Sequence, residues 1–417
     1  MANRHDRIIS SNRKREMDIM RLIPRYSYME KIINVIGTPD IKVITGVRRC
    51  GKSKLLESFK KYIDENIQDA NIIHINFNLP EFEELLTFRA LYEHINSLYK
   101  ENMQNFVLID EVQMCEDFEK AINGLHASEK YDIYITGSNA YFMSGELATL
   151  LSGRYVELKM LPLSFKEYVS AFDGSKSLEE LYNSYLYNSS FPYTVGMTNR
   201  RNIHAYLDGI FNTIVLNDIV QRKKVQNPLM LKSVIKFMFD NIGNPCTAKK
   251  ISDSMTSQGL KISNHTVETY LEGLTDSLLM YRVSRYDIKG KDYLQLLDKY
   301  YIADIGLRYY LLGLNSTDRG HILENVVYLE LVRRGYTVYV GKNGSAEVDF
   351  VVQDYDGNTE YYQVLWSVRE ESTLKRELSA LESIQDHNPK YILTMDNDPP
   401  ISYNGIRQIN VLKWLVE

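Results

Sequence analysis

The sequence has little cysteine, little proline and no long apolar run. Its three cysteines, Cys50, Cys115 and Cys246, show no paired spacing, so neither a disulfide framework nor a zinc site is expected. With 22 glycines and 10 prolines among 417 residues, the chain is neither collagen-like nor of low complexity. No uncharged apolar run reaches the roughly 18 residues of a membrane span, and the N-terminus lacks the apolar core of a secretory signal. We therefore expect a cytoplasmic protein with no membrane partner.

The chain also lacks a large excess of charge of one sign. The chain carries 49 Lys and Arg against 54 Asp and Glu, a formal net charge of −5, which excludes a polycation that wraps nucleic acid through bulk electrostatics. At roughly 150 residues per domain, the length predicts two to three domains. Residues 1–25 are locally basic. We expect a solvated tail that runs into a helix there; a contact for nucleic acid or an acidic partner is the alternative.

Strand-like and helix-like segments alternate from residue 41 onward. Short apolar or β-branched runs, typical of strands, lie at 41–45, 71–77, 105–110 and 131–136. Segments with apolar residues at helical spacing lie between them, at 52–66, 82–99 and 118–128. Such alternation predicts βαβ units and a parallel sheet.

The segment GVRRCGKS matches G-x-x-x-x-G-K-[ST] and lies between the first predicted strand and the first predicted helix. A loop of this kind presents backbone N–H groups and a helix N-terminus to a phosphate. Gly46 and Gly51 permit positive φ and close backbone approach. We predict that Lys52 reaches the β- and γ-phosphates and that Ser53 ligates Mg²⁺. The predicted nucleotide-binding set is Gly46, Val47, Arg48, Arg49, Cys50, Gly51, Lys52, Ser53 and Lys54.

An acidic pair follows the apolar strand 105–110. Asp110 and Glu111 stand at its carboxyl end, which faces the ligand crevice in an open α/β sheet. We predict that Asp110 holds Mg²⁺ together with Ser53, and that Glu111 acts as a general base on, or polarises, the attacking water. A solvated strand end is the alternative.

Polar residues also follow strand 131–136. At this position beside the acidic strand, a side chain can orient the attacking water and sense the γ-phosphate. We predict this role for Asn139, with Ser138 as the second candidate. Ordinary turn chemistry is the alternative, because Gly-Ser-Asn favours turns.

Arg154 lies just before a predicted strand at 155–161. A guanidinium stays charged and pairs bidentately with phosphate oxygens. We predict an arginine finger supplied across a subunit interface, which requires a homo-oligomer; a structural ion pair is the alternative. The predicted catalytic set is Lys52, Glu111, Asn139 and Arg154.

These segments resemble a known family. ITGVRRCGKSKLLESF, VLIDEVQ, YITGSNAYFMSGELATLLSGRY and LPLSFKEY are similar to the AAA-type ATPase module of a large group of bacterial and archaeal proteins. HILENVVYLELVRRGYTVYVGKNGSAEVDFVV, YYQVLWSV and KRELSALESI are similar to the C-terminal module of that group, whose function is poorly defined. The resemblance implies an ATP-hydrolysing core, a helical lid, a winged-helix segment and a nuclease-like end, with ATP rather than GTP as the nucleotide.

We therefore expect an α/β protein in which a P-loop NTPase parallel sheet is followed by a helical lid, a winged-helix segment and a small C-terminal α/β nuclease-like domain. The expected parts are a basic N-terminal segment at 1–25, an AAA-type ATPase domain at 26–172, a helical lid at 173–230, a winged-helix-like domain at 231–312 and a nuclease-like domain at 320–417.

The winged-helix segment has the order helix, turn, helix, wing. Its second helix is expected to begin at Ser263 or Asn264 as N-cap and to expose His265, Thr266 and Glu268 on its first turn. Such a helix can enter the major groove of DNA. Residues 245–290 carry six basic and five acidic side chains. This small excess of positive charge predicts only a weak attraction to the phosphates of DNA. DNA binding and packing or protein contact therefore both stay open.

The C-terminal acids resemble the metal-dependent nuclease core of many restriction enzymes. Glu324, Glu347 and Asp349 would, on that likeness, hold Mg²⁺, which prefers carboxylate oxygens. The sequence departs from the pattern, because Gln363 replaces a glutamate and Leu365 replaces a lysine. We expect an inactive fold used for binding. The candidate site in the alternative, an active nuclease, is Glu324, Asp349 and Gln363.

The function expected from these residues is Mg²⁺-dependent ATP hydrolysis that drives or gates a conformational change, acting on DNA or a protein partner. Two alternatives stay open. One is a slow nucleotide-dependent binding switch with little turnover, and the other is a DNA nuclease gated by ATP.

Overall fold

The computed structural model describes residues 23–137, 151, 153–290, 292–314 and 318–417. These residues form two compact units. The N-terminal unit comprises Arg21–Pro162 with Asp276–Leu278, and the C-terminal unit comprises Leu163–Thr275 with Leu279–Glu417. Within the described residues, no helix combines the length and the apolar character that crossing a membrane requires.

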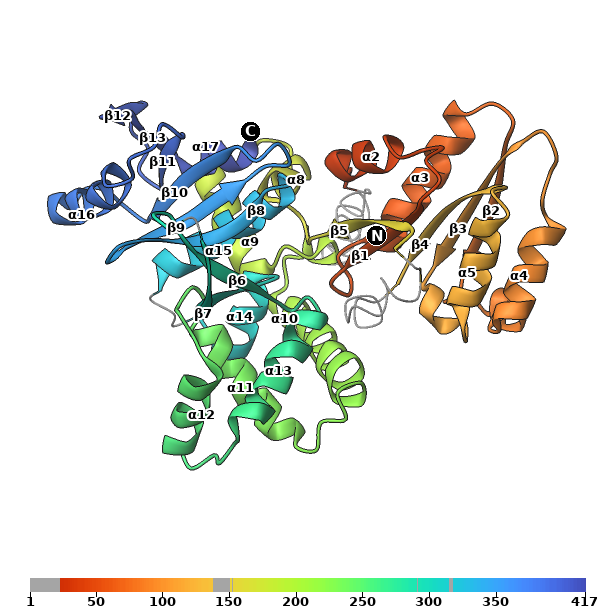
Figure 1. The fold of residues 1–417 in the computed structure, drawn as a ribbon, viewed down its shortest axis with the longest axis horizontal. Coiled ribbons are helices and arrows are strands. Elements are labelled where there is room, and N and C mark those ends of the chain that lie inside the picture. The colour runs from red at the N-terminus through yellow and green to blue at the C-terminus, as the bar shows by residue number, and fades with distance from the viewer. Residues whose placement is uncertain (1–22, 138–150, 152, 291, 315–317) are drawn as a thin grey trace, which may run out of the picture. The chain divides into compact units, whose positions relative to one another are not determined.

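The N-terminal unit contains a five-stranded sheet in the order β2-β3-β4-β1-β5, and all its pairings are parallel. Its strands are β1 (Ile41–Gly46), β2 (Ala70–Asn76), β3 (Gln104–Asp110), β4 (Tyr131–Thr136) and β5 (Tyr155–Met160). Its helices are α2 (Tyr26–Ile33), α3 (Lys52–Asn66), α4 (Phe88–Ser97) and α5 (Phe118–Ala127) (Figure 1). The predicted parallel sheet is confirmed.

The central strands of the sheet are buried on both faces because helices pack against them. One face packs against α4 and α5 through a cluster that includes Val43, Val107 and Ile135. On α3, Phe59 lies 4.6 Å, between ring centroids, from Tyr134 of β4. Lys42 of β1 is also buried, and its Nζ lies 2.7 Å from Asp132 Oδ1. The pairing matters because an unpaired buried ammonium costs several kcal/mol.

The segment 82–99, expected to form one helix, is divided. A short 3₁₀ helix spans Pro80–Leu85, and α4 begins only at Phe88, with Thr87 as N-cap. Between them, the backbone bonds to a distant segment: Glu116 N–H donates to Leu86 O at 2.8 Å, and Phe88 N–H donates to Glu116 O at 3.1 Å. This tertiary pairing interrupts a segment whose local pattern is helical throughout.

The C-terminal unit begins with helices. They are α8 (Phe165–Ser170), α9 (Leu178–Asn188), α10 (Arg200–Thr213), α11 (Pro228–Asp240), α12 (Ala248–Ser257) and α13 (Asn264–Asp276). A 3₁₀ turn spans Pro192–Thr194, and α10 continues into a π-helix at Ile214–Gln221. Later in the chain come α14 (Ile305–Leu312), α15 (Arg319–Arg333), α16 (Glu371–Glu382) and α17 (Val411–Val416).

A mixed eight-stranded sheet completes this unit, in the order β12-β13-β11-β10-β9-β8-β6-β7. Its strands are β6 (Met280–Asp287), β7 (Asp292–Ile302), β8 (Thr337–Asn343), β9 (Ala346–Gln353), β10 (Thr359–Leu365), β11 (Lys390–Thr394), β12 (Ile401–Tyr403) and β13 (Ile406–Asn410). The β6–β7 hairpin, expected within 231–312, joins the strands of 320–417 because β6 pairs in parallel with β8. One sheet therefore contains strands from both expected segments.

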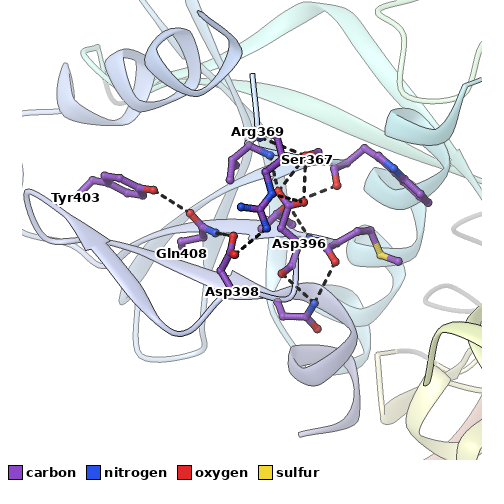
Figure 2. A network of polar contacts seen from close by, with 11 residues as sticks. Ser367, Arg369, Asp396, Asp398, Tyr403 and Gln408 are labelled. Atoms are coloured by element: carbon purple, nitrogen blue, oxygen red, sulfur yellow. Dashed lines mark hydrogen bonds and ion pairs between the residues drawn. The ribbon is translucent and has the colours of Figure 1, made fainter. Parts of the chain in front are cut away.

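Polar side chains hold together the carboxyl ends of β10 and β11, which are parallel neighbours (Figure 2). Asp396 accepts hydrogen bonds from Ser367 Oγ at 3.0 Å and from Val368 N–H at 2.7 Å. Arg369 pairs with Asp398 at 2.7 Å. The Asn410 side chain donates to the backbone oxygen of Asp396 at 3.1 Å. The network thus fixes the loops that follow these strands.

Candidate functional site

The glycine-rich loop connects β1 to α3, as the sequence predicts. Gly46 ends β1, and a Cβ there would lie 2.3 Å from the backbone oxygen of Met160, so only glycine permits β5 to approach this closely. Gly51 precedes α3 with φ of 111°, in the left-handed region that favours glycine. Between them, Cys50 N–H donates to Val47 O at 3.2 Å. The loop thus ends where the free N–H groups of α3 begin.

Lys52 is buried, and its Nζ donates to Gly46 O at 2.9 Å. Its ammonium is therefore held against the loop itself, at the end of β1. Lys54 differs: its side chain is 64% exposed and pairs with Glu57 at 2.6 Å along the helix surface. Ser53 is half-buried and Arg49 is exposed. The loop therefore holds one buried ammonium from the predicted set, whereas Lys54 could contribute only backbone.

The remaining predicted loop residues also differ in whether their side chains are buried or exposed. Val47 and Cys50 are fully buried. Their side chains pack the loop against the N-terminal unit, so these residues could contact a phosphate only through their backbone. Arg48 is half-buried. Arg49 has φ of 68°, a left-handed conformation at a residue other than glycine, which makes the loop turn sharply before Gly51.

Asp110 ends β3 at the same edge of the sheet, and β4 lies between β3 and β1. Its side chain is buried, and its Oδ1 accepts the hydroxyl hydrogen of Thr136. Its Oδ2 is buried and has no hydrogen-bond partner among the described residues. A buried carboxylate oxygen left unpaired is costly and suits an oxygen-seeking cation or a bound water. The donor set at this point therefore fits Mg²⁺.

Glu111 follows in a left-handed conformation, with φ of 57°. Its N–H donates to Thr136 Oγ1 at 3.2 Å, and its carboxylate accepts from Gln113 Nε2. Thr136 therefore donates to one acid and accepts from the backbone of the next, which fixes both. The sequence analysis missed Thr136, although its place at the end of strand 131–136 is a signal that could have found it.

Asn139 and Ser138 lie outside the described residues. Arg154 is exposed and precedes β5. Its backbone oxygen accepts Ile41 N–H at 3.0 Å, and the register places Tyr155 opposite Ile41 but Met160 opposite Gly46. Arg154 thus lies at the amino edge of the sheet, about 17 Å of strand from the loop at ~3.3 Å per residue. The chain does not bring Arg154 to its own loop.

Arg25 is a second residue that the sequence analysis missed. It is buried, and its guanidinium donates to Cys50 O at 3.0 Å and to Leu161 O at 2.7 Å. It also lies over the Tyr28 ring, 4.8 Å from the centroid. One side chain therefore ties the glycine-rich loop to the end of β5, just before the chain passes at Leu163 into the C-terminal unit. No sequence motif around Arg25 predicts this long-range contact.

The C-terminal candidates come from three elements. Glu324 lies on α15, Asp349 on β9 and Gln363 on β10. Gln363 Oε1 accepts Asp349 N–H at 3.2 Å, so these two touch directly. Glu324 instead contacts Lys299 of β7, whose Nζ lies 2.9 Å from Glu324 Oε1. Lys299 did not figure in the predicted site.

Comparison with known proteins agrees with this architecture. Residues 38–169 match the family described as an AAA domain, and residues 179–318 match a domain of unknown function. An uncharacterized protein of Haemophilus influenzae is 40% identical over 95% of this chain and 99% of its own length. The uncharacterized protein MJ1544 of Methanocaldococcus jannaschii is 30% identical over 95% of this chain and 90% of its own. The chain belongs to the family of these two proteins, and its N-terminal unit is a P-loop domain of the AAA type.

Among solved structures, the Walker-type ATPase PABY2304 of Pyrococcus abyssi is similar, with a TM-score of 0.47 and 15% identity over 70% of this chain and 96% of that one. The parallel order β2-β3-β4-β1-β5 and the match to an AAA domain confirm the predicted α/β class with a P-loop NTPase parallel sheet. The helical lid, the winged-helix segment and the nuclease-like character of the C-terminal domain stay predictions.

We expect Arg25→Ala to loosen the glycine-rich loop, because the carbonyls of Cys50 and Leu161 lose a charged donor worth roughly 1.5–3 kcal/mol per bond. Hydrogen exchange measured by mass spectrometry should show faster exchange over residues 46–53. Arg89→Ala, which removes an exposed arginine of α4, is the matched control and should leave that exchange unchanged. Equal exchange in both variants would contradict the assigned contact.

Proposed function

We propose that this protein binds ATP with Mg²⁺ and hydrolyses it. The observation that carries the proposal is the pairing of two features at one edge of the sheet. The buried Lys52 ammonium lies against the loop at the end of β1, and the partnerless Oδ2 of Asp110 lies at the end of β3. A triphosphate needs a cation and backbone N–H groups, and its metal needs oxygen ligands.

The roles follow from the chemistry of each group. N–H groups at the start of α3 would bind the phosphate oxygens, with the partial positive charge of the helix N-terminus. Lys52 would exchange its bond to Gly46 O for the β- and γ-phosphates. Ser53 and Asp110 would hold Mg²⁺, which would supply charge neutralisation on the phosphate oxygens. Glu111, fixed by Thr136, would position and polarise the attacking water.

The proposed activity explains why the loop and the acids are held so tightly. Catalysis by preorganised charge requires that the groups be in place before the reaction starts. Thr136 provides this for Asp110 and Glu111, and Arg25 provides it for Cys50 in the loop. We propose that turnover gates a movement of the C-terminal unit. Arg25 contacts both the glycine-rich loop and Leu161, and Leu161 lies at the end of β5, just before the C-terminal unit begins at Leu163.

Replacing Lys52 with alanine should weaken ATP binding about 100-fold or abolish it, because the site loses its buried ammonium. Titration with a fluorescent ATP analogue measures this directly. Lys61→Ala removes an exposed lysine of the same helix and should bind ATP as the wild type does. Undiminished turnover in Lys52→Ala would overturn the site assignment.

Glu111→Gln should retain nucleotide binding but lose about 10²-fold or more in turnover, the usual contribution of a general base. Phosphate release under single-turnover conditions separates the two effects. The matched variant Glu116→Gln changes an exposed carboxylate of the following segment and should keep wild-type rates. A Glu111→Gln variant that hydrolyses ATP normally would remove Glu111 from the mechanism.

A second function, DNA binding by the C-terminal unit, has a specific observation in its favour. Helices α12 and α13 followed by the β6–β7 hairpin have the order of a winged helix. Lys249 on α12 and Lys261 just before α13 are both exposed, as is His265 on the first turn of α13. The two lysines would contact phosphates while the N-terminal turn of α13, which carries His265, enters a groove.

Reversing both charges, in Lys249→Glu/Lys261→Glu, should weaken binding to a duplex about tenfold or more at 0.15 M salt and lower the salt slope by about 2. Fluorescence anisotropy measures both quantities, and ATP turnover with and without DNA tests coupling. Lys375→Glu on α16 is the control for charge reversal elsewhere. If wild-type turnover is slow and DNA neither binds nor stimulates it, a nucleotide-dependent switch for a protein partner is favoured instead.

A further inference from the structure

A group of charges lies where β7, β9 and α15 meet in the C-terminal unit, and it is buried at Lys299 and Glu324 but partly exposed at Glu347. The Lys299 side chain is 4% exposed, and its Nζ lies 2.9 Å from Glu324 Oε1 and 2.9 Å from Glu347 Oε1. The Tyr301 hydroxyl donates to Glu324, and Arg285 pairs with Glu347 at 3.3 Å. We call Lys299, Glu324, Glu347 and Asp349 the Lys299 cluster.

The fold itself places the ammonium of Lys299 among acids. Its Nζ contacts carboxylate oxygens from two different elements, Glu324 of α15 and Glu347 of β9. The lysine is therefore shared by two carboxyl groups, and Asp349 is close enough to act on its charge. Such a cation is strongly coupled to its neighbours, because a buried charge pair is screened far less than an exposed one.

Two other candidate ligands make hydrogen bonds of their own. Asp349 Oδ2 accepts Val364 N–H at 2.8 Å. Gln363 uses both ends of its amide: Oε1 accepts Asp349 N–H at 3.2 Å, and Nε2 donates to Glu377 Oε2 at 2.5 Å. Both ends of the Gln363 amide thus make hydrogen bonds within the sheet and to α16, and the side chain lacks the negative charge of the glutamate that a nuclease core would carry there.

Leu365 confirms that this strand has no catalytic cation. The nuclease pattern requires a lysine at this position, whose charge lowers the pKa of a metal-bound water. Leu365 instead packs into the apolar cluster of the C-terminal sheet, with Ile392 and Leu381. The only lysine that contacts the acids within the described residues is Lys299, which comes from β7 and hence from outside the pattern.

These contacts do not fit a divalent metal. Mg²⁺ requires near-octahedral oxygen ligands, and the ammonium stands between the carboxylates that would supply them. Bringing a divalent ion next to a fixed cation in a buried site is repulsive. Within the part of the chain that the structure describes, no group of three or more His, Cys, Asp or Glu side chains is arranged to hold a metal ion.

We propose that the ammonium of Lys299 takes the place of the divalent metal in this cluster, so that the cluster stabilises the C-terminal sheet and is not the metal centre of a nuclease. The lysine neutralises the acids and joins β7 to α15 and β9 at the same time. This proposal is independent of ATP hydrolysis, because the P-loop residues play no part in it.

The test is Mn²⁺ titration of the full-length protein without nucleotide, followed by electron paramagnetic resonance. Wild type should show no Mn²⁺ site that depends on Glu324 or Asp349. Lys299→Met should gain about one equivalent of bound Mn²⁺ that the wild type lacks, because the carboxylates then face one another without their cation. Lys390→Met is the matched control, since this lysine of the same sheet donates only to the carbonyl oxygens of Ile384 and Asp386; it should gain nothing.

Two outcomes would overturn the proposal. One is a folded Lys299→Met protein, with a wild-type circular dichroism spectrum, that gains no Mn²⁺ site. The other is metal-dependent nicking of a supercoiled plasmid by the wild type that is lost in Asp349→Ala. The second assay needs no change at Lys299, so it decides the question even where Lys299→Met does not fold; wild type without nicking supports the proposal.

Discussion

Parallel pairing of β3, β4 and β1 is the constraint on which the N-terminal unit depends. Parallel strands carry their carboxyl ends to one edge of a sheet, so residues far apart in sequence meet there. Gly46, Thr136 and Asp110 end three neighbouring strands. The hydroxyl of Thr136 then bonds to Asp110 and to the backbone of Glu111. The sheet thus determines where these side chains lie, and the glycine-rich loop places the N-terminus of α3 beside them.

Buried charges show where the chain neutralises itself and where it does not. Lys42 pairs with Asp132, and Lys299 pairs with both Glu324 and Glu347, so the chain's own acids neutralise these two buried cations. Asp110 differs, because one of its oxygens is buried and has no partner among the described residues. A protein that pairs buried charges elsewhere tolerates such an oxygen most readily where a ligand completes it.

Much of the N-terminal unit could be predicted from the sequence, because β-branched runs, helical periodicity and a phosphate-loop motif are local signals. The strands 41–45, 105–110 and 131–136 match β1, β3 and β4 within one residue. The break between Leu85 and Phe88 could not be predicted, because it depends on a backbone pairing with Glu116.

The contacts missed in the sequence share one cause: each joins segments distant in the chain. Arg25 reaches Leu161, 136 residues later. Lys299 lies on β7, a strand that the sequence analysis did not single out, and it meets α15 and β9 only when the hairpin pairs into the sheet. Local patterns indicate which residue types are present, but a buried cation acquires its role from the partners that tertiary structure brings to it.

The continuity of the C-terminal sheet has a mechanical consequence. Because β6 pairs with both β7 and β8, the hairpin that follows α13 is hydrogen-bonded to β8, which in turn pairs with β9, the strand that carries Glu347 and Asp349. A displacement of α13 would therefore pass into the eight-stranded sheet through interstrand hydrogen bonds rather than through a flexible linker.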